Sequence, residues 1–214
     1  MMEAQKRIQM VRELEMEGIR DKKVLEAMEK IPRHEFVPEG LREEAYLNIP
    51  LPVGYEQTIS QPYTIAFMLE ALELEKGQKV LEVGTASGYN ACLIAEIVGK
   101  KGRVYTVEII KALAKFAKEN IKKEGIKNVR VIGGDGSRGY EKAKPYDRVI
   151  ITAGAPEVPP PLIKQLKKGG IIVAPIGPLY SQSMIKLKKT EKGLTRKDLG
   201  AFVFVPLKGK YGHS

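Results

Sequence analysis

The sequence predicts an α/β protein built on a doubly wound, mostly parallel sheet, and three observations support this prediction. A short apolar run at 80–83 leads directly into a glycine-rich turn and then into a helical pattern. Strand-like and helical patterns then alternate up to residue 176. Two strand-like stretches follow without a helix between them, at 184–189 and 194–205. Such alternation is typical of a parallel sheet, and the last pair predicts an antiparallel edge.

The composition is that of a soluble globular protein, since 43% of the 214 residues are hydrophobic and 29% are charged. No apolar run reaches the ~20 residues that a membrane-spanning helix needs, and no secretory segment follows the first residues. The single cysteine, Cys92, excludes an internal disulfide and a cysteine metal cluster, so we expect no metal. We expect a cytoplasmic protein. Its Lys/Glu-rich, Trp-free composition resembles that of thermophile proteins.

The net charge of +10 could indicate a nucleic-acid partner. The lysine pairs, however, are scattered over different predicted elements, among them Lys22-Lys23, Lys100-Lys101 and Lys188-Lys189. Scattered cations are typical of solvated faces and helix ends. We therefore expect no nucleic-acid partner. We also expect no membrane partner and a monomer.

Residues 1–55 are predicted to form a helical N-terminal extension. Apolar spacing predicts a first helix, and Asp21 is a good N-cap for a second. Prolines 50 and 52 exclude regular structure over 48–54. The expected elements of the extension are helices at 2–17 and 22–30, and a short helix or turn at 41–46.

Residues 56–180 are predicted to form the core, and 181–214 a C-terminal strand pair and tail of the same domain. Five strands are expected in the core and two after it, seven in total. The core strands are expected at 80–83, 103–108, 128–133, 146–152 and 171–176, and the helices at 63–72, 89–98, 112–123 and just before 166.

The glycine turn predicts a ligand site. Gly84 permits a sharp turn, and Gly88 permits close packing of strand and helix. The resulting crevice faces a helix N-terminus. Glu82 in the buried strand is unhelpful to a pyrophosphate and suits a cationic or polar cofactor. The alternative interpretation is a structural turn that binds nothing.

A second informative stretch precedes the helix at 63–72. Pro62 fits the first helical turn, with Ser60 or Gln61 at the N-cap. The polar residues before this helix start could cradle a carboxylate, although an ordinary N-cap serine is the simpler interpretation. Glu108 ends the second strand, about 20 residues past the turn, where an acid can accept bonds from ribose hydroxyls. Asp135 follows the third strand within reach of an adenine amine, unless it only forms a turn.

Three groups of residues, at 80–88, at Glu108 and at 134–136, resemble the cofactor motifs of class I methyltransferases that use S-adenosylmethionine. Three further segments narrow the resemblance to protein-L-isoaspartate O-methyltransferases. These segments are IPRHEFVP at 31–38, QTISQPY at 57–63 and PYDRVIITAGA at 145–155. The resemblance covers nearly the whole chain, and its TISQP segment is specific to that family.

The resemblance implies a Rossmann-like fold and methyl transfer from S-adenosylmethionine to the α-carboxylate of L-isoaspartyl residues in damaged peptides and proteins. S-adenosylhomocysteine is the second product, and the ester then cyclises to a succinimide, which initiates repair. The catalytic residue would be Ser60, whose hydroxyl donates to the substrate carboxylate. The cofactor-binding residues would be Gln57, Thr58, Ile59, Ser60, Gly84, Thr85, Glu108, Gly134, Asp135 and Gly136, and the substrate-binding residues Val53, Tyr55, Thr58, Ile59, Ser60 and His213.

The chemistry needs no general base, because a carboxylate is already ionised at neutral pH. His34 and His213 therefore need not take a proton. Glu82 is expected to orient the glycine loop or the cofactor ammonium indirectly. We expect the N-terminal helices to cover the cofactor and the irregular segment 48–60 to act as a lid.

The sequence also departs from the family pattern in two places. Ala86 replaces the usual middle glycine and is tolerated if its φ stays negative, and the tail at 207–214 is short. A nucleic-acid methyltransferase is the main competing hypothesis and is favoured by the charge. Against it, Thr152-Ala-Gly-Ala155 lacks the Asn/Asp-Pro-Pro-aromatic element of enzymes that methylate base amines. A non-enzymatic cofactor-binding protein and a dinucleotide dehydrogenase are weaker hypotheses; the intact TISQP segment opposes the first, and the glycine spacing opposes the second.

Overall fold

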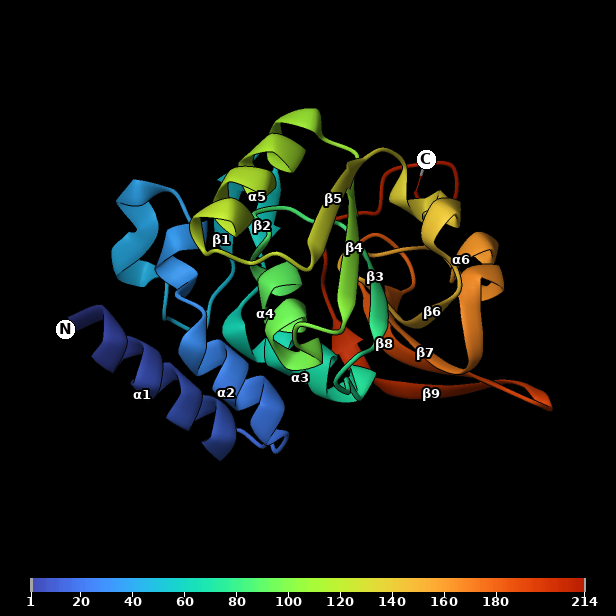
Figure 1. Ribbon diagram of the computed structural model, residues 1–214, viewed down its shortest axis with the longest axis horizontal. Helices are drawn as coiled ribbons and strands as arrows, with labels where there is room; N and C mark the ends of the chain where they lie inside the picture. Colours follow the sequence, from blue (N-terminus) through green and yellow to red (C-terminus); the bar gives the residue numbers. More distant parts are fainter. Residues whose placement is uncertain (1, 214) are drawn as a thin grey trace.

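The computed structural model describes residues 2–213 and is organised around one seven-stranded sheet (Figure 1). The order across the sheet is β5-β4-β3-β6-β7-β8-β9, with β8 and β9 antiparallel to their neighbours and the other strands parallel. This confirms the predicted seven-stranded mixed sheet. The strands are β3 (Lys79–Val83), β4 (Arg103–Glu108), β5 (Val129–Gly133), β6 (Tyr146–Ile151), β7 (Leu166–Ile176), β8 (Gln182–Thr190) and β9 (Gly193–Phe202).

Helices cover both faces of the sheet unequally. One face carries α3 (Pro62–Leu72), α4 (Tyr89–Val98) and α5 (Lys111–Lys123). The other carries the short α6 (Pro160–Gln165) and the 3-10 turns η3 (Gly136–Arg138) and η4 (Glu141–Ala143). Alternation along β3 separates the two cores, because Val80 packs in the larger cluster with α3 and α4 while Leu81 and Val83 pack in the smaller one. No helix within residues 2–213 is long and apolar enough to span a membrane.

The N-terminal extension shares the larger core with the sheet domain. Its helices α1 (Met2–Met16) and α2 (Lys22–Lys30) pack on α3 and α4, and the 3-10 turns η1 (Arg33–Phe36) and η2 (Glu39–Glu44) follow. Asp21 caps α2 as predicted, since its carboxylate accepts the Lys23 N–H at 2.9 Å. The Leu14 side chain is 1% exposed within this common core.

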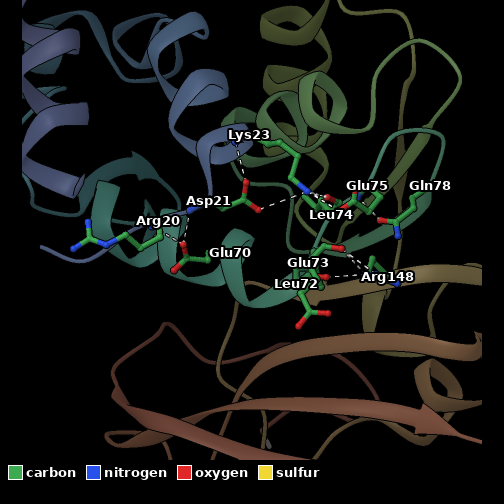
Figure 2. A network of polar contacts seen from close by, with 10 residues as sticks. All are labelled: Arg20, Asp21, Lys23, Glu70, Leu72, Glu73, Leu74, Glu75, Gln78 and Arg148. Atoms are coloured by element: carbon green, nitrogen blue, oxygen red, sulfur yellow. Dashed lines mark hydrogen bonds and ion pairs between the residues drawn. The ribbon is translucent and has the colours of Figure 1, made fainter. Parts of the chain in front are cut away.

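Polar contacts fix the extension to the C-terminal end of α3 (Figure 2). Glu70 Oε1 accepts the backbone N–H groups of Arg20 and Asp21, each at 2.6 Å. Lys23 Nζ donates to the carbonyl of Leu74 at 2.8 Å. On the sheet side, Arg148 Nε donates to the carbonyl of Leu72 at 2.7 Å. The helix α3 is therefore held at one end, while its other end begins at the turn that carries Ser60.

The prediction that 48–54 is irregular is wrong for 51–54 and holds for 48–50, which belong to no helix or strand. Residues Leu51–Gly54 form β1, which pairs antiparallel with β2 (Gln57–Ile59) in a small hairpin. Proline is tolerated because this two-stranded ribbon has free edges and a bulge follows Pro52. The two loop residues, Tyr55 and Glu56, have φ values of 54° and 58°, as a type I′ turn requires.

Candidate functional site

Two segments far apart in the sequence line one cleft at the carboxyl ends of β3 and β4, hereafter the central cleft. The first is the segment from Gln57 to Ser60, and the second is the loop from Gly84 to Ser87. The cleft is completed by the end of β4, by Thr152 and by the chain at 205–208. The sequence-based expectation that the serine turn and the glycine loop meet is confirmed.

Both glycines at the ends of the loop are required by space and backbone conformation. Gly84 has a φ of +95°, and a Cβ there would lie 2.4 Å from Thr152 Oγ1. That hydroxyl donates to the Gly84 carbonyl at 2.7 Å and so fixes the loop. Gly88 has a φ of +89°, and a Cβ there would lie 3.2 Å from Ile121 Cδ1. The predicted sharp turn and close approach are both present.

Ala86 contradicts the expectation of a negative φ, because its φ is +47°. Such a backbone costs a non-glycine residue about 1–2 kcal/mol. In return, the Ala86 N–H points at Glu108 and donates to Oε2 at 2.9 Å. Glu108 Oε1 accepts the Ile110 N–H at 2.9 Å. Each carboxylate oxygen keeps a further lone pair, so Glu108 can still accept two hydroxyls from a ligand in the cleft.

Glu82 lies beneath the loop and is fully buried. Its carboxylate accepts Asn90 Nδ2 at 2.7 Å and Thr106 Oγ1 at 2.5 Å. Burial raises the pKa of Glu82 to about 7, although these two hydrogen bonds act to lower it. When Glu82 is ionised, the Thr106 hydroxyl donates to it, and the Thr85 hydroxyl then donates to Thr106 across their 2.5 Å contact. The chain from Glu82 thus orients Thr85, which lines the central cleft.

Ser60 does not cap α3. The N-cap is Gln61, which makes no capping bond through its side chain, and Pro62 occupies the first turn as predicted. The cap acceptor comes from a remote residue, since Asn48 Oδ1 accepts the Tyr63 N–H at 3.0 Å. The ordinary N-cap interpretation of Ser60 is therefore wrong, and this side chain lines the central cleft instead.

A second hollow adjoins the first, hereafter the side groove. It shares five residues with the central cleft, namely Thr58, Ser60, Thr152, Val205 and Pro206. Its far side carries exposed apolar residues, with Tyr180 86% and Val203 76% exposed. Two ligands, one in each hollow, would meet at the wall that contains Ser60.

Several predicted site residues lie away from both hollows. Asp135 is engaged by the C-terminal tail: Oδ2 accepts the Lys210 N–H at 2.9 Å, and Oδ1 accepts the Ser137 hydroxyl at 2.6 Å. Burial acts to raise the pKa of Asp135, but these hydrogen bonds outweigh it and hold this pKa below its usual value. Of the segment 134–136, Gly136 lines the central cleft, whereas Gly134 and Asp135 do not.

The three residues predicted to flank the substrate are also outside. Val53 is buried, Tyr55 is 61% exposed at the hairpin tip, and His213 donates its backbone N–H to the Leu207 carbonyl at 3.0 Å. None of them lines either hollow in the described chain. The tail does return to the cleft, but through Pro206, Leu207 and Lys208.

The N-terminal helices do not cover the central cleft, contrary to expectation. Within residues 2–213 the lining of this cleft begins at Gln57, and α1 and α2 pack behind α3 and α4 instead. The apolar faces of α1 and α2 are buried in the shared core, so neither helix has an apolar face left to cover a ligand. The segment 48–60, expected to be a lid, contains the β1–β2 hairpin, of which 57–59 form part of the wall.

Sequence reasoning missed Asn90, Thr152 and the lining residues of the tail. Thr152 follows β6, a neighbour of β3 in the sheet, so its place at a strand's carboxyl end was a usable signal. No local sequence pattern predicts that the exposed residues Leu179, Tyr180 and Val203 line the side groove. Their position depends on how β8 and β9 pair with the rest of the sheet.

The donor set of the central cleft fits S-adenosylmethionine. Within the described chain, Glu108 and Lys208 are the charged residues of its lining, so the cleft lacks the cluster of cations that a pyrophosphate prefers. Glu108 offers acceptors for a ribose diol, and Gly136 provides a close wall, since a Cβ there would lie 2.6 Å from Val83 Cγ1. A cationic cofactor with a ribose suits this arrangement.

Comparison with known proteins identifies the family. The family model described as protein-L-isoaspartate(D-aspartate) O-methyltransferase matches residues 5–212. A protein-L-isoaspartate O-methyltransferase of Methanosarcina mazei is 49% identical over 98% of this chain and 88% of its own length. One of Ignicoccus hospitalis is 53% identical over 96% of this chain and 98% of its own.

Solved structures agree with this comparison. A protein-L-isoaspartate O-methyltransferase superposes with a TM-score of 0.86 at 33% identity and covers 96% of this chain and 67% of its own. A Plasmodium falciparum protein of the same description, in complex with S-adenosyl-L-homocysteine, gives 0.84 at 27% identity over 94% of this chain and 98% of its own. The chain belongs to the protein-L-isoaspartate(D-aspartate) O-methyltransferase family.

Proposed function

We propose that this enzyme transfers the methyl group of S-adenosylmethionine to the α-carboxylate of L-isoaspartyl residues in peptides and proteins. The observation that carries the proposal is the wall shared by the two hollows, which contains Thr58, Ser60 and Thr152. The donor would occupy the central cleft and the acceptor the side groove. Family membership supports the same reaction and the same cofactor.

The cofactor would be held by the residues that line the central cleft. When bound, S-adenosylmethionine supplies a methyl group that its sulfonium centre already activates. Glu108 would accept the ribose hydroxyls, and the loop that contains Gly84 and Thr85 would hold the methionine end. The carbonyl of Gly84 is fixed by Thr152 and the hydroxyl of Thr85 by Thr106, so the loop is ordered by contacts within the protein.

Ser60 would donate its hydroxyl to one oxygen of the substrate carboxylate. The enzyme needs no base, because that carboxylate carries its charge at neutral pH. A neutral donor suits the reaction, because the carboxylate loses its charge in the transition state and a cation at this place would stabilise the ground state more. Backbone groups of Thr58 and Ile59 would position the acceptor beside Ser60. Alignment of this kind can contribute up to about 7–11 kcal/mol to catalysis.

We further propose a monomer as the working unit, with isoaspartyl polypeptides as its partners and neither nucleic acid nor membrane among them. A monomer is supported by the construction of both hollows from residues of one chain. The cytoplasm is the proposed location, in line with the single cysteine, Cys92, whose side chain is fully buried in the core.

The test is transfer of labelled methyl groups from S-adenosylmethionine to three acceptors. These are an isoaspartyl peptide, the same peptide with ordinary aspartate, and transfer RNA. The expected product is a base-labile methyl ester on the isoaspartyl peptide alone. Label on the RNA, or equal label on both peptides, would refute the proposal.

A further inference from the structure

A third hollow runs along α3 from the end of the side groove, and it differs from the side groove in the chemistry of its lining residues. It lies between α3 and the strands β8 and β9, and we name it the basic groove. Phe67, Ala71 and Leu199 form its apolar part. Its charged lining residues are Lys186, Lys188, Arg196, Lys197, Glu70 and Glu73.

The basic groove continues the side groove. Gln61 and Thr64 line the side groove, whereas Phe67 and Ala71 line the basic groove, at a spacing that places all four on one face of α3. On the opposite wall, the chain from Leu199 to Phe204 passes from one hollow to the other.

Three aromatic side chains lie between the side groove and the basic groove, of which Phe67 and Phe202 are half-buried and Phe204 is buried. The ring centroids of Phe67 and Phe202 are 5.3 Å apart, and those of Phe202 and Phe204 are 6.5 Å apart. Phe67 lines the basic groove and Phe204 the side groove. An extended polypeptide could therefore pass over an apolar floor from one hollow into the other.

The basic groove has an excess of positive charge. Four cations line it against two carboxylates, and both carboxylates have partners within the protein. Glu70 accepts two backbone N–H groups, and its neighbour Glu73 points toward the strands (Figure 2). Glu73 also forms an ion pair with Lys186. Lys188 and Lys197 are exposed and have no ion-pair partner within residues 2–213. Lys197 is paired in register with Lys186, and the next pair on the same face contains Lys188.

We infer that the basic groove binds acidic side chains of the polypeptide substrate, and that it makes the enzyme prefer isoaspartyl sites with acidic residues a few positions away on one side. This inference rests on the proposed function and adds a specificity to it. The helical rise places Ala71 about 10–15 Å from Thr64 and Gln61. An extended chain spans that distance in roughly three to five residues. A peptide fits better than RNA because the groove continues from the acceptor site and its free positive charge is small. Among the described residues, Lys188 and Lys197 lack ion-pair partners on this face, whereas Arg196 is paired in register with Leu187, which packs in the smaller core on the other face of the sheet.

The test uses isoaspartyl peptides on a neutral background. Two glutamates are placed three to five residues from the isoaspartyl residue, on its amino side in one peptide and on its carboxyl side in another, with glutamine versions as controls. We expect one glutamate peptide to show a KM about fivefold lower than its glutamine control, the size that two exposed ion pairs supply together. The difference should vanish in 0.5 M salt, because exposed charges are then screened.

Two double variants decide where the effect arises. In Lys188→Gln/Lys197→Gln the KM for the favoured glutamate peptide should rise to that of its glutamine control. Lys118→Gln/Lys122→Gln on α5 removes the same charge at exposed positions and should keep the preference. Equal KM values for glutamate and glutamine peptides on both sides would overturn the inference, as would a preference that survives in the first double variant. Binding of single-stranded RNA that is lost in that variant, without any peptide preference, would overturn it too. If the neutral isoaspartyl peptide is not methylated at all, the proposed function fails instead.

Discussion

Replacing Glu82 by glutamine tests the buried charge beneath the glycine loop. Glu82 is fully buried, and burial raises its pKa from 4.5 to about 7 against the hydrogen bonds from Thr106 and Asn90. The folded protein therefore binds this proton more tightly than the unfolded chain does. It follows that the free energy of unfolding decreases as pH rises from about 4.5 to about 7, and that this contribution is constant above that range.

The size of the effect follows from the shift. One pKa unit corresponds to about 1.4 kcal/mol, so the ionisation of Glu82 removes about 3 kcal/mol of stability across the window. Glutamine cannot ionise. Between pH 4.5 and 7.5 the wild-type protein should lose about 3 kcal/mol more than Glu82→Gln. Urea denaturation followed by circular dichroism at several pH values gives both curves, and their difference cancels all other titrating groups.

An exposed carboxylate provides the control. Glu119 on α5 has a side chain that is 63% exposed, so Glu119→Gln should follow the wild-type curve across this window. Parallel curves for the wild-type protein and Glu82→Gln would show that Glu82 has the same pKa in both states. That result would refute the argument that burial destabilises the charged form of Glu82.

Three other substitutions test the glycine loop, the proposed ribose site and the C-terminal end of α3. Gly84→Ala would place a Cβ 2.4 Å from Thr152 Oγ1 at a positive φ and should destabilise the fold by roughly 2 kcal/mol or more in urea denaturation; an unchanged midpoint would contradict the packing. Glu108→Ala should raise the Kd for S-adenosylhomocysteine about tenfold or more in calorimetry, and an unchanged Kd would reject the ribose role. Glu70→Gln replaces the charged acceptor of the α1–α2 loop and should reduce stability by about 1–2 kcal/mol, with faster amide exchange at Arg20 and Asp21. Unaltered exchange there would remove Glu70 from that role.

The sheet was predictable because its signals are local. Each parallel strand is a short apolar run beside a glycine or a helix pattern, as at 80–88, and Gly84 and Gly88 adopt the conformations that only glycine takes easily. The place of Ser60 and Glu108 in one cleft could also be predicted, because both lie beside motifs with a fixed geometry. Asp21 as a helix cap is a further local signal that the structure confirms.

The errors arise where distant segments decide the outcome. Ala86 takes a positive φ, and in this conformation its N–H donates to Glu108, 22 residues further along the chain. Asp135 accepts a hydrogen bond from the Lys210 backbone N–H in the C-terminal tail, 75 residues further along the chain. No local sequence pattern reveals this contact. The hairpin at 51–59 forms despite Pro52 because each strand of a two-stranded ribbon has one unpaired edge, where proline is tolerated. The tertiary structure decides whether a strand has such an edge, so the local sequence does not reveal it.

The central claim is that Ser60 donates a hydrogen bond to the acceptor carboxylate where the central cleft and the side groove adjoin. The claim also states that Ser60 is not needed to hold the cofactor. The most direct test compares Ser60→Ala with the wild-type enzyme in kcat for an isoaspartyl peptide and in Kd for S-adenosylhomocysteine. The account predicts a kcat at least about tenfold lower with a Kd within about twofold of wild type. An unchanged kcat would contradict it.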